Sequence, residues 1–452
     1  MLLLPLLLIA AAPDWIPARW HSSDPKSLEI VAETPINCLL IEKPDWSAEF
    51  AKAAASKGIA TLAVVRPAPD SLDQARKAAG LGMTGVVLEG DFDPKVPLAL
   101  ADSKILTVDL PSRAHMRFDD PKQIVIGSDQ GLWPGIEIED NGSTKSAPSG
   151  APWIDTNTGF LRFVRSYTEN AVWIANLPPP HTVIPVNHYL QAIGDAAITG
   201  SRWVIALDDD FNHRLLARQP QALADWKRIG VALQYYESHK DWKAMKPHGQ
   251  LALVEDVDSG ALLSGGILDM IAVKHTPVQP VPNPKLSDAA MKNKQMAVDV
   301  DPGALTPPEK QVLRNFTRAG GTLLSAPPGW TFPMPANGAI TLGAEDFKKL
   351  DEIWKEVNGM MGRTNLGARL FNVSSMLSNL VGTPDGKCVA LHLVNYTDFP
   401  VEAITAHVLG TYTHARLYAP GAAPRDLPVY KVEEGTGVDI DKVDVLATLV
   451  LE

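Results

Sequence analysis

The feature that most constrains the fold of this chain is a regular alternation of apolar runs and amphipathic segments between residues 36 and 246. Apolar runs rich in β-forming residues occupy 36–42, 59–65, 84–90, 105–111, 123–129, 152–157, 171–176 and 202–208. The segments between them, such as SAEFAKAAASKG and SLDQARKAAGLG, carry apolar residues at helical spacing and end in glycine. Strands that alternate with helices and are apolar on both faces are typical of a buried parallel sheet. Eight strand–helix units predict a closed (β/α)8 TIM-type barrel, with an open doubly wound sheet as the alternative.

Two further domains are predicted after residue 246, where this alternation stops. LALVEDVDSG, MAVDVD and TLLSAPPG have the composition of three more strands. Between the last two, Thr306 and Glu309 form the capping box of a helix that ends at Gly320 and Gly321. From about residue 386, CVALHLVNYT, VEAITAHVLG, HARLYAP and DVLATLVLE are short β-rich runs separated by turn residues, which is typical of an antiparallel sandwich. We therefore divide the chain into a leader at 1–12, a barrel at 13–246, a small α/β domain at 247–365 and a β-sandwich at 366–452.

The apolar run from Leu2 to Ala12 predicts an exported protein. Its eleven residues are too few to cross a membrane, which takes about 20, but they fit the apolar core of a secretory signal. We expect a secreted or periplasmic protein, and no later stretch is long enough to predict a membrane span.

Charge and cysteine content argue against several kinds of partner. The chain has 52 acidic and 41 basic residues and a formal net charge of −11, which disfavours binding to nucleic acid or to anionic membranes. Cys38 and Cys388 lie in apolar runs of different domains, so we expect buried free thiols rather than a disulfide. Neither has a second cysteine or a histidine at metal-ligand spacing, and we predict no metal and no cofactor.

Carboxylates and amides follow nearly every predicted barrel strand, at the end where barrel enzymes place their chemistry. In strand order from the third to the eighth they are Glu89, Asp109, Asp129, Asp155, Asn176 and Asp208. Carboxylates around one mouth raise each other's pKa, so that one can serve as an acid while another stays ionised. Glycoside hydrolysis needs this division of roles. We expect Asp109 to be nucleophile or base and Asp155 to be the general acid, with Glu89 and Asp208 as alternatives for either role.

The same rim offers residues that suit sugar binding. Trp133 and Trp153 provide flat apolar faces for stacking, and Asn176, Asp129 and Arg113 provide polar contacts. Each residue also has a plainer interpretation, because most tryptophans fill cores and an aspartate after a strand often caps the next helix. Asp210 in particular is expected to be a solvated or capping residue.

The order of the predicted domains resembles glycoside hydrolases with an N-terminal barrel, a flavodoxin-like or amidotransferase-like middle domain and a small C-terminal β-sandwich. The segments that carry this resemblance are GQLALVEDVDSGALLSGGILDMI, LRNFTRAGGTLLSAPPG and DGKCVALHLVNYT. In addition, QGLWPGIEIED, SGAPWIDTNTGFLRFVRSYT and RWVIALDDDF are similar to uncharacterised bacterial proteins of glycosidase-like type. Some β-galactosidases of this order trimerise through the middle domain, so the resemblance implies a homo-oligomer formed through that domain.

The resemblance does not transfer a catalytic pair directly. Those β-galactosidases carry catalytic glutamates after strands four and seven, where the predicted strand order has Asp109 and Asn176. A pair of aspartates after strands four and six, here Asp109 and Asp155, is closer to α-galactosidase-like barrels. The middle domain lacks a nucleophilic cysteine in the amidotransferase pattern, so we expect its role to be structural.

Three functions are consistent with these features. The leading hypothesis is an exported glycoside hydrolase that acts on a plant or microbial glycan through paired carboxylates. The second is a non-catalytic carbohydrate-binding protein on a degenerate barrel, which the missing strand-seven glutamate favours. The third is a metal-dependent hydrolase that uses the aspartate cluster at Asp208.

Overall fold

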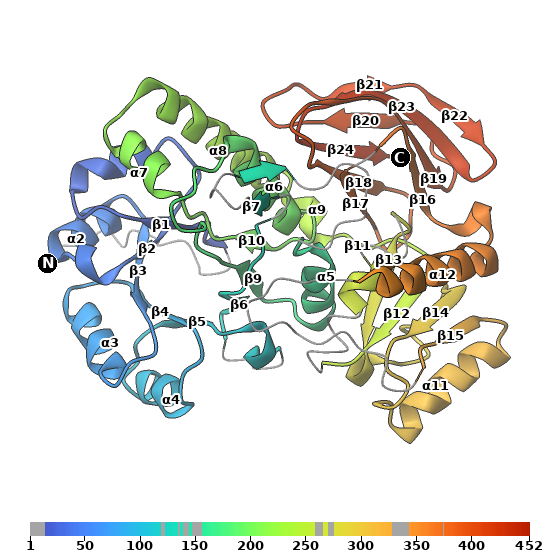
Figure 1. The fold of residues 1–452 in the computed structure, drawn as a ribbon, viewed down its shortest axis with the longest axis horizontal. Helices are drawn as coiled ribbons and strands as arrows, with labels where there is room; N and C mark the ends of the chain where they lie inside the picture. The colour runs from blue at the N-terminus through green and yellow to red at the C-terminus, as the bar shows by residue number, and fades with distance from the viewer. Residues whose placement is uncertain are drawn as a thin grey trace, which may run out of the picture.

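A parallel eight-stranded barrel forms the N-terminal part of the molecule, which we describe from a computed structural model (Figure 1). Its strands are β1 (Pro17–Trp20), β2 (Cys38–Ile41), β3 (Ala60–Val65), β4 (Gly85–Glu89), β5 (Thr107–Leu110), β6 (Val125–Ser128), β9 (Ala171–Ile174) and β10 (Arg202–Trp203), hydrogen-bonded in that order. A parallel bridge between Ala18 and Ile205 joins the first strand to the segment after the last, where Arg19 N donates to Ile205 O at 2.7 Å. The predicted (β/α)8 barrel is therefore confirmed.

The structure describes residues 14–118, 123–133, 136–138, 144–146, 156–257, 265–269, 275–327, 343–373 and 375–452. The predicted leader at 1–12 lies outside this set. No helix of the described ranges is long and apolar enough to cross a membrane.

The count of eight barrel strands was right, but two of the assignments behind it were wrong. The segment at 36–42 contains the second strand, because β1 precedes it. The run at 152–157 does not supply a barrel strand, because β6 pairs directly with β9 in parallel register. Thr156 and Asn157 lead straight into helix α5 (Thr158–Tyr167), and 152–155 lie outside the described residues. As a result Glu89 ends the fourth strand rather than the third, and Asp109 lies on the fifth rather than the fourth.

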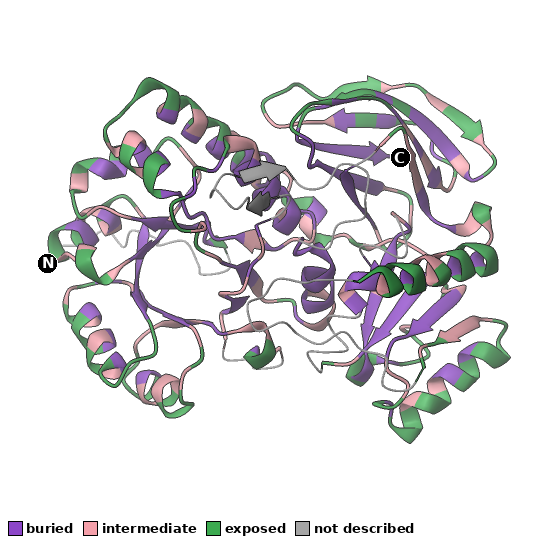
Figure 2. Ribbon diagram, in the orientation of Figure 1, coloured by how far each residue is buried: buried purple, intermediate pink, exposed green. Residues whose placement is uncertain are grey.

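Side chains of the barrel strands alternate between the interior and the surrounding helices. Trp15, Leu40, Val64, Leu110 and Trp173 belong to one interior cluster. Their neighbours along the strands belong to a second cluster that includes residues of the helices. Figure 2 shows the barrel strands buried and the surrounding helices partly exposed. This alternation decides which charged residues reach the barrel mouth.

The helices of the barrel cover its outer face (Figure 1). They are α1 (Leu28–Val31), α2 (Ala48–Ser56), α3 (Ser71–Gly80), α4 (Lys95–Asp102), α5, α6 (Val186–Ala197), α7 (Asp209–Leu216), α8 (Pro220–Ser238) and α9 (Lys240–Ala244). Helix α2 begins after an N-cap residue, Ser47, whose Oγ accepts from Phe50 N at 3.2 Å. A short antiparallel pair, β7 (Ile136–Ile138) and β8 (Thr144–Ser146), lies between β6 and α5 in the chain.

The second domain is a four-stranded parallel sheet with two long helices. The strand order is β13 (Val278–Pro282), β12 (Leu251–Glu255), β14 (Met296–Asp299) and β15 (Thr322–Ser325). Helix α11 (Pro307–Arg318) follows Thr306, whose N–H donates to Glu309 Oε2 at 2.7 Å, so this part of the predicted capping box is present. Helix α12 is Ala344–Met361. Three strands were predicted, and β13 was missed because its sequence, VQPVP, contains two prolines.

The C-terminal part contains two antiparallel sheets that pack as a sandwich, as predicted. One has the order β11 (Lys246–Pro247), β17 (Met376–Gly382), β18 (Val389–Asn395), β24 (Leu446–Leu451), β20 (Ala415–Tyr418) and β21 (Arg425–Leu427). The other has the order β16 (Ala368–Phe371), β19 (Val401–Leu409), β23 (Gly435–Val443) and β22 (Val429–Val432). Both cysteines are free; Cys38 is buried and Cys388 is half-buried.

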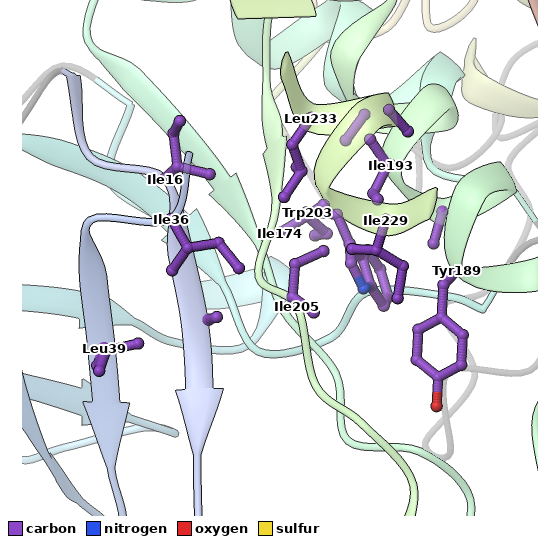
Figure 3. Close-up of a cluster of buried hydrophobic side chains, with 14 of the residues drawn as sticks. Ile16, Ile36, Leu39, Ile174, Tyr189, Ile193, Trp203, Ile205, Ile229 and Leu233 are labelled. Atoms are coloured by element: carbon purple, nitrogen blue, oxygen red, sulfur yellow. The ribbon is translucent and has the colours of Figure 1, made fainter. Parts of the chain in front are cut away.

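The barrel and the sandwich share one core on the side of α6 and α8. Figure 3 shows the barrel end of this core, where Ile193 of α6 and Ile229 of α8 lie over Trp203 and Ile205. Sandwich residues such as Val394 and Leu446 belong to the same cluster. Gly194 fits this close approach, because a Cβ there would lie 2.3 Å from Leu446 Cδ2, whose side chain would have to shift.

Candidate functional site

Five charged side chains enter the mouth of the barrel from the carboxyl ends of its strands. Arg19 lies in β1, Glu42 and Arg66 directly follow β2 and β3, Glu89 ends β4, and Asp129 directly follows β6. In a strand, a residue faces the interior if it is two positions from an interior side chain or adjacent to an outward-facing one. Each of the five residues meets one of these conditions. The carboxyl ends of parallel barrel strands meet at one rim, so these groups form one cluster.

Two arginines and two glutamates in this mouth form a connected set of ion pairs. Arg66 donates to both oxygens of Glu42 at 2.8 Å, and Arg19 Nη1 lies 3.1 Å from Glu42 Oε1. Arg66 Nη2 also lies 2.7 Å from Glu89 Oε2, and Arg19 Nη2 contacts Glu89 Oε1. The Arg19 side chain is 0% exposed and that of Glu89 8%, so this pairing takes place away from solvent. Two neighbouring cations favour the charged form of Glu89.

Burial and pairing act in opposite directions on the ionisable groups of this set. Burial lowers the pKa of Arg19 to about 10, although the Glu42 and Asp129 charges oppose the shift. Burial alone would raise the pKa of Glu42, but hydrogen bonds from Arg66 and the charge of Arg19 hold it below its ordinary value. Glu42 is therefore an ionised partner of the arginines, not a proton donor.

Asp129 is a carboxyl group of the mouth that loses its proton less readily than an ordinary aspartate. Its pKa is raised to about 6, chiefly by burial and then by the charge of Asp91, and the opposing charges of Arg19 and Arg66 do not cancel this. Its Oδ1 is buried and has no hydrogen-bond partner among the described residues. Its Oδ2 lies 3.9 Å from the point where a Cβ on Gly90 would stand, which places it beside the residue that follows Glu89. A carboxyl group with a pKa near 6, close to a glutamate that pairs with two arginines, has the properties of an acid–base pair.

Asp91 lies at the edge of this cluster and is more exposed. Its Oδ1 accepts from Ser112 N at 3.0 Å, and its Oδ2 lies 3.0 Å from His115 Nδ1. Burial alone would raise the pKa of Asp91, but the bonds from Ser112 and His115 lower it below the ordinary value. Asp91 is thus the ionised neighbour that raises the pKa of Asp129.

Asp109, the expected nucleophile or base, faces away from the barrel interior. Its chain neighbours Val108 and Leu110 belong to the interior cluster, so Asp109 points toward the outer layer. Its partners across the sheet, Leu88 and Ile126, belong to the outer cluster as well. Arg117 Nη2 lies 3.4 Å from its Oδ2.

Asp208 has the geometry of a helix cap. Its Oδ1 accepts from Phe211 N at 2.9 Å at the start of α7. Its Oδ2 accepts from Ile184 N at 3.1 Å and from the Tyr189 hydroxyl at 2.8 Å. Among the described residues no group of three or more His, Cys, Asp or Glu side chains could hold a metal ion, so the aspartates after β10 offer no metal site there.

The expected sugar-binding residues are tied into the protein. Trp133 is 7% exposed, packs edge-to-face on Tyr189 and Trp203, and donates to Leu177 O at 3.0 Å, which places it in the core rather than on a stacking floor. Asn176 donates to Gly131 O at 2.6 Å. Arg113 donates to Asn157 Oδ1 at 2.8 Å. Asp155 and Trp153 lie outside the described residues, so the expected Asp109–Asp155 separation stays untested.

Sequence reasoning missed the three partners that complete the cluster: Arg19, Glu42 and Arg66. Glu42 and Arg66 are each the first charged residue after an apolar strand, a signal already present in INCLLIE and LAVVRP. Arg19 was missed together with its strand, which has only four residues and starts with proline.

The fold recurs in solved glycosidase structures. An α-L-fucosidase isoenzyme 2 from Paenibacillus thiaminolyticus superposes with a TM-score of 0.59 at 10% identity, covering 97% of this chain and 99% of that one. A β-galactosidase from Rahnella sp. R3 superposes with a TM-score of 0.55 at 9% identity, covering 98% and 99%. No protein-family model and no curated protein matches the sequence. At this identity the likeness shows the fold, a barrel followed by a β-rich C-terminal part over the whole chain, as predicted.

Proposed function

We propose that this protein is a glycoside hydrolase whose reaction takes place at the carboxyl-end mouth of the barrel. The observation that carries the proposal is the pair of carboxyl groups in contrasting environments: Asp129, with its pKa raised to about 6, and Glu89, paired with two arginines. Hydrolysis of a glycosidic bond needs one protonated and one ionised carboxyl group on the two sides of the bond. The fucosidase and the β-galactosidase of the same fold support the reaction class.

In this mechanism Asp129 donates its proton to the glycosidic oxygen as the bond to the anomeric carbon breaks. The electron pair of that bond stays with the leaving group, which departs as an alcohol. In one route Glu89, as the carboxylate, attacks the anomeric carbon, and water then cleaves this glycosyl-enzyme bond while Asp129 takes the proton of the water. In the other route Glu89 takes a proton from the water that attacks the anomeric carbon directly. Desolvation in the mouth favours protonated Asp129 before the reaction and strengthens the electrostatic interactions of the transition state.

Arg19 and Arg66 act as positioning residues for the ionised carboxylate. Each contacts a different oxygen of Glu89, and Glu42 connects the two guanidinium groups from the other side. This arrangement holds Glu89 in one rotamer at little cost in entropy when substrate binds.

The assignment moves the acid–base pair from Asp109 and Asp155 to Asp129 and Glu89. With the observed strand order, Glu89 occupies the end of the fourth strand, where the β-galactosidases that the chain resembles carry one catalytic glutamate. The end of the seventh strand still offers Asn176, and the second role falls to Asp129 after the sixth. The substrate we propose is a plant or microbial glycan.

A panel of aryl glycosides and glycans tests the proposal, with Asp129→Asn and Glu89→Gln measured beside the parent. Each should lower kcat/KM by about 10²-fold or more on the cleaved substrate, as expected for loss of a general acid or of the ionised carboxylate. Asp109→Asn is the matched control, because it removes a carboxylate from the neighbouring strand on the opposite face. Full activity of Asp129→Asn would refute the acid assignment.

A carbohydrate-binding protein without activity is the second candidate. It is favoured by the ion pairs of Glu42 and Glu89, each of which has both carboxylate oxygens in contact with Arg19 or Arg66. Glycan binding that Arg66→Gln abolishes, with no turnover of any substrate in the panel, would support this function and refute the hydrolase.

A further inference from the structure

A cavity lies at the opposite end of the barrel from the mouth. Its volume is about 300 Å³, which is within the range of small-molecule sites. Ser166 and Glu169 precede β9, and Thr199 and Gly200 precede β10, so these lining residues belong to the amino ends of the strands. Pro280 of β13 and Asn379 of β17 complete its walls, so barrel, middle domain and sandwich all contribute (Figure 1).

Positive charge dominates the lining of this cavity. Five cationic side chains and one carboxylate line it: Arg162, Arg165, Lys243, Lys246, Lys285 and Glu169. His392 also lines it, but burial lowers its pKa to about 3, so it adds no charge at neutral pH. Such a concentration is unusual for a chain whose formal net charge is −11.

Arg162 is neutralised within the protein and does not contribute to the excess. Its Nη1 pairs with buried Asp269, its Nη2 donates to Ser378 O at 2.8 Å, and its Nε donates to Asn379 Oδ1 at 3.1 Å. This guanidinium therefore ties the three parts of the molecule together and has a structural role.

The other four cations of the lining outnumber the single carboxylate, Glu169, that lines the cavity with them. Glu169 lies 2.7 Å from Lys246 and 4.0 Å from Arg165, and the charge of Lys285 also reaches it. Lys285 itself donates to the carbonyls of Ser166 and Tyr167. Glu169 is 78% exposed and Lys246 57%, which makes this group the open rim of the cavity.

The inner end of the cavity shows the same imbalance. Lys243 pairs with Glu237 at 2.7 Å, but Arg202 uses the same carboxylate oxygen at 3.0 Å. Burial and the charge of Arg202 lower the pKa of Lys243, and burial lowers the pKa of Arg165. An anion placed between Lys243 and Arg165 would favour their charged forms and so oppose the lowering of both pKa values.

We infer that this cavity binds a small multivalent organic anion, carrying carboxylate or phosphate groups, between Arg165, Lys243, Lys246 and Lys285. Apolar residues such as Ile198, Val281 and Val381 line the rest of the wall and fit the body of such a molecule. The ligand would bridge the barrel to the other two parts and act at a distance from the mouth. The inference does not depend on the proposed glycosidase activity.

Calorimetric titration of the full chain with citrate and with inorganic phosphate, at constant ionic strength in chloride, tests this inference. We expect saturable one-to-one binding of at least one probe, and comparison of the two distinguishes carboxylate from phosphate recognition. Lys246→Gln should weaken binding by about tenfold or more, since it removes one charge-assisted hydrogen bond. Lys285→Gln should weaken it similarly. The bound anion should also raise the thermal midpoint by a few degrees.

Two control variants locate the effect. Lys442→Gln removes a lysine that pairs with Asp444 at 3.0 Å in the sandwich, away from the cavity, and should leave affinity unchanged. Arg66→Gln removes a cation from the barrel mouth and should also leave it unchanged, which separates this site from the proposed active site. Absence of binding by both probes at about 10 mM, or unchanged affinity in both Lys246→Gln and Lys285→Gln, would overturn the inference.

Discussion

Replacement of Asp129 by asparagine should stabilise the folded protein at neutral pH and not at acidic pH. The pKa of Asp129 is about 6 in the fold and 3.8 for an ordinary aspartate, chiefly because folding buries the group. The folded state therefore holds the proton more tightly than the unfolded state. Between these two pH values the folded state loses stability as pH rises, and above about pH 6 the whole cost of the buried charge is present.

The magnitude follows from the difference between the two pKa values. Each tenfold change in proton affinity corresponds to about 1.4 kcal/mol, so the upper bound is about 3 kcal/mol. Asp129 is half-buried, so solvent screening reduces the expected effect to about 1 to 2 kcal/mol. An asparagine at this position has no charge to desolvate at any pH.

Urea unfolding followed by tryptophan fluorescence, at about pH 4.5 and about pH 7.5, measures this effect. The difference in unfolding free energy between Asp129→Asn and the parent should become more favourable by about 1 kcal/mol at the higher pH, because roughly a third of the effect is already present at about pH 4.5. Asp210→Asn is the control, because it removes an exposed carboxylate of α7 that lies outside the mouth. A difference that is the same at both pH values would refute the argument that folding raises the pKa of Asp129.

Three further predictions test the site and the fold. If Asp129 is the general acid, kcat/KM on a cleaved aryl glycoside should decline above about pH 6, because the acid loses its proton; a profile flat to pH 8 would contradict this. Arg162→Met should destabilise the protein by about 3 to 5 kcal/mol in thermal unfolding, because buried Asp269 would lose its cation; an unchanged midpoint would argue against their pairing. Gly85→Ala should cost about 1 to 3 kcal/mol, since its Cβ would lie 2.5 Å from Leu106 O, whereas Gly80→Ala, with open space around the Cβ, should change stability by about 1 kcal/mol at most.

The barrel could be predicted because most of its strands are apolar on both faces. β2, β3 and β4 are each fully buried over four to six residues and follow one another at helix-length intervals. β1 breaks this pattern, since its four residues, PARW, begin with proline and place a charge on the interior face. The run at 152–157 was assigned as a strand on composition alone, and direct pairing of β6 with β9 excludes it from the barrel. The total of eight was still correct, because the unpredicted strand β1 and the wrongly predicted strand at 152–157 cancel in the count.

The site could be predicted only to the level of the rim. Any polar residue at the end of a strand belongs to that rim, but whether it points inward depends on a one-residue phase. Val87 and Leu88 are equally apolar, although one faces the interior and the other the helices, so composition could not set this phase for Glu89 or Asp109. The raised pKa of Asp129 depends chiefly on its burial and then on the charge of Asp91, against the opposing charges of Arg19 and Arg66. These groups come from other strands, so the balance arises only from their arrangement in space.

The charged barrel mouth is better explained by function than by stability. A buried ion pair is often no more stabilising than apolar side chains of similar volume. Stability therefore does not explain why the barrel has the Arg19–Glu89 pair at this position. Asp129 is clearer still, because its raised pKa means that folding opposes its charge at neutral pH. A structural role would be met by asparagine without this cost, whereas proton transfer requires a carboxyl group that titrates near the working pH. The Asp129→Asn variant therefore links the two properties: greater stability at neutral pH together with lost turnover is the result that a catalytic carboxyl group predicts.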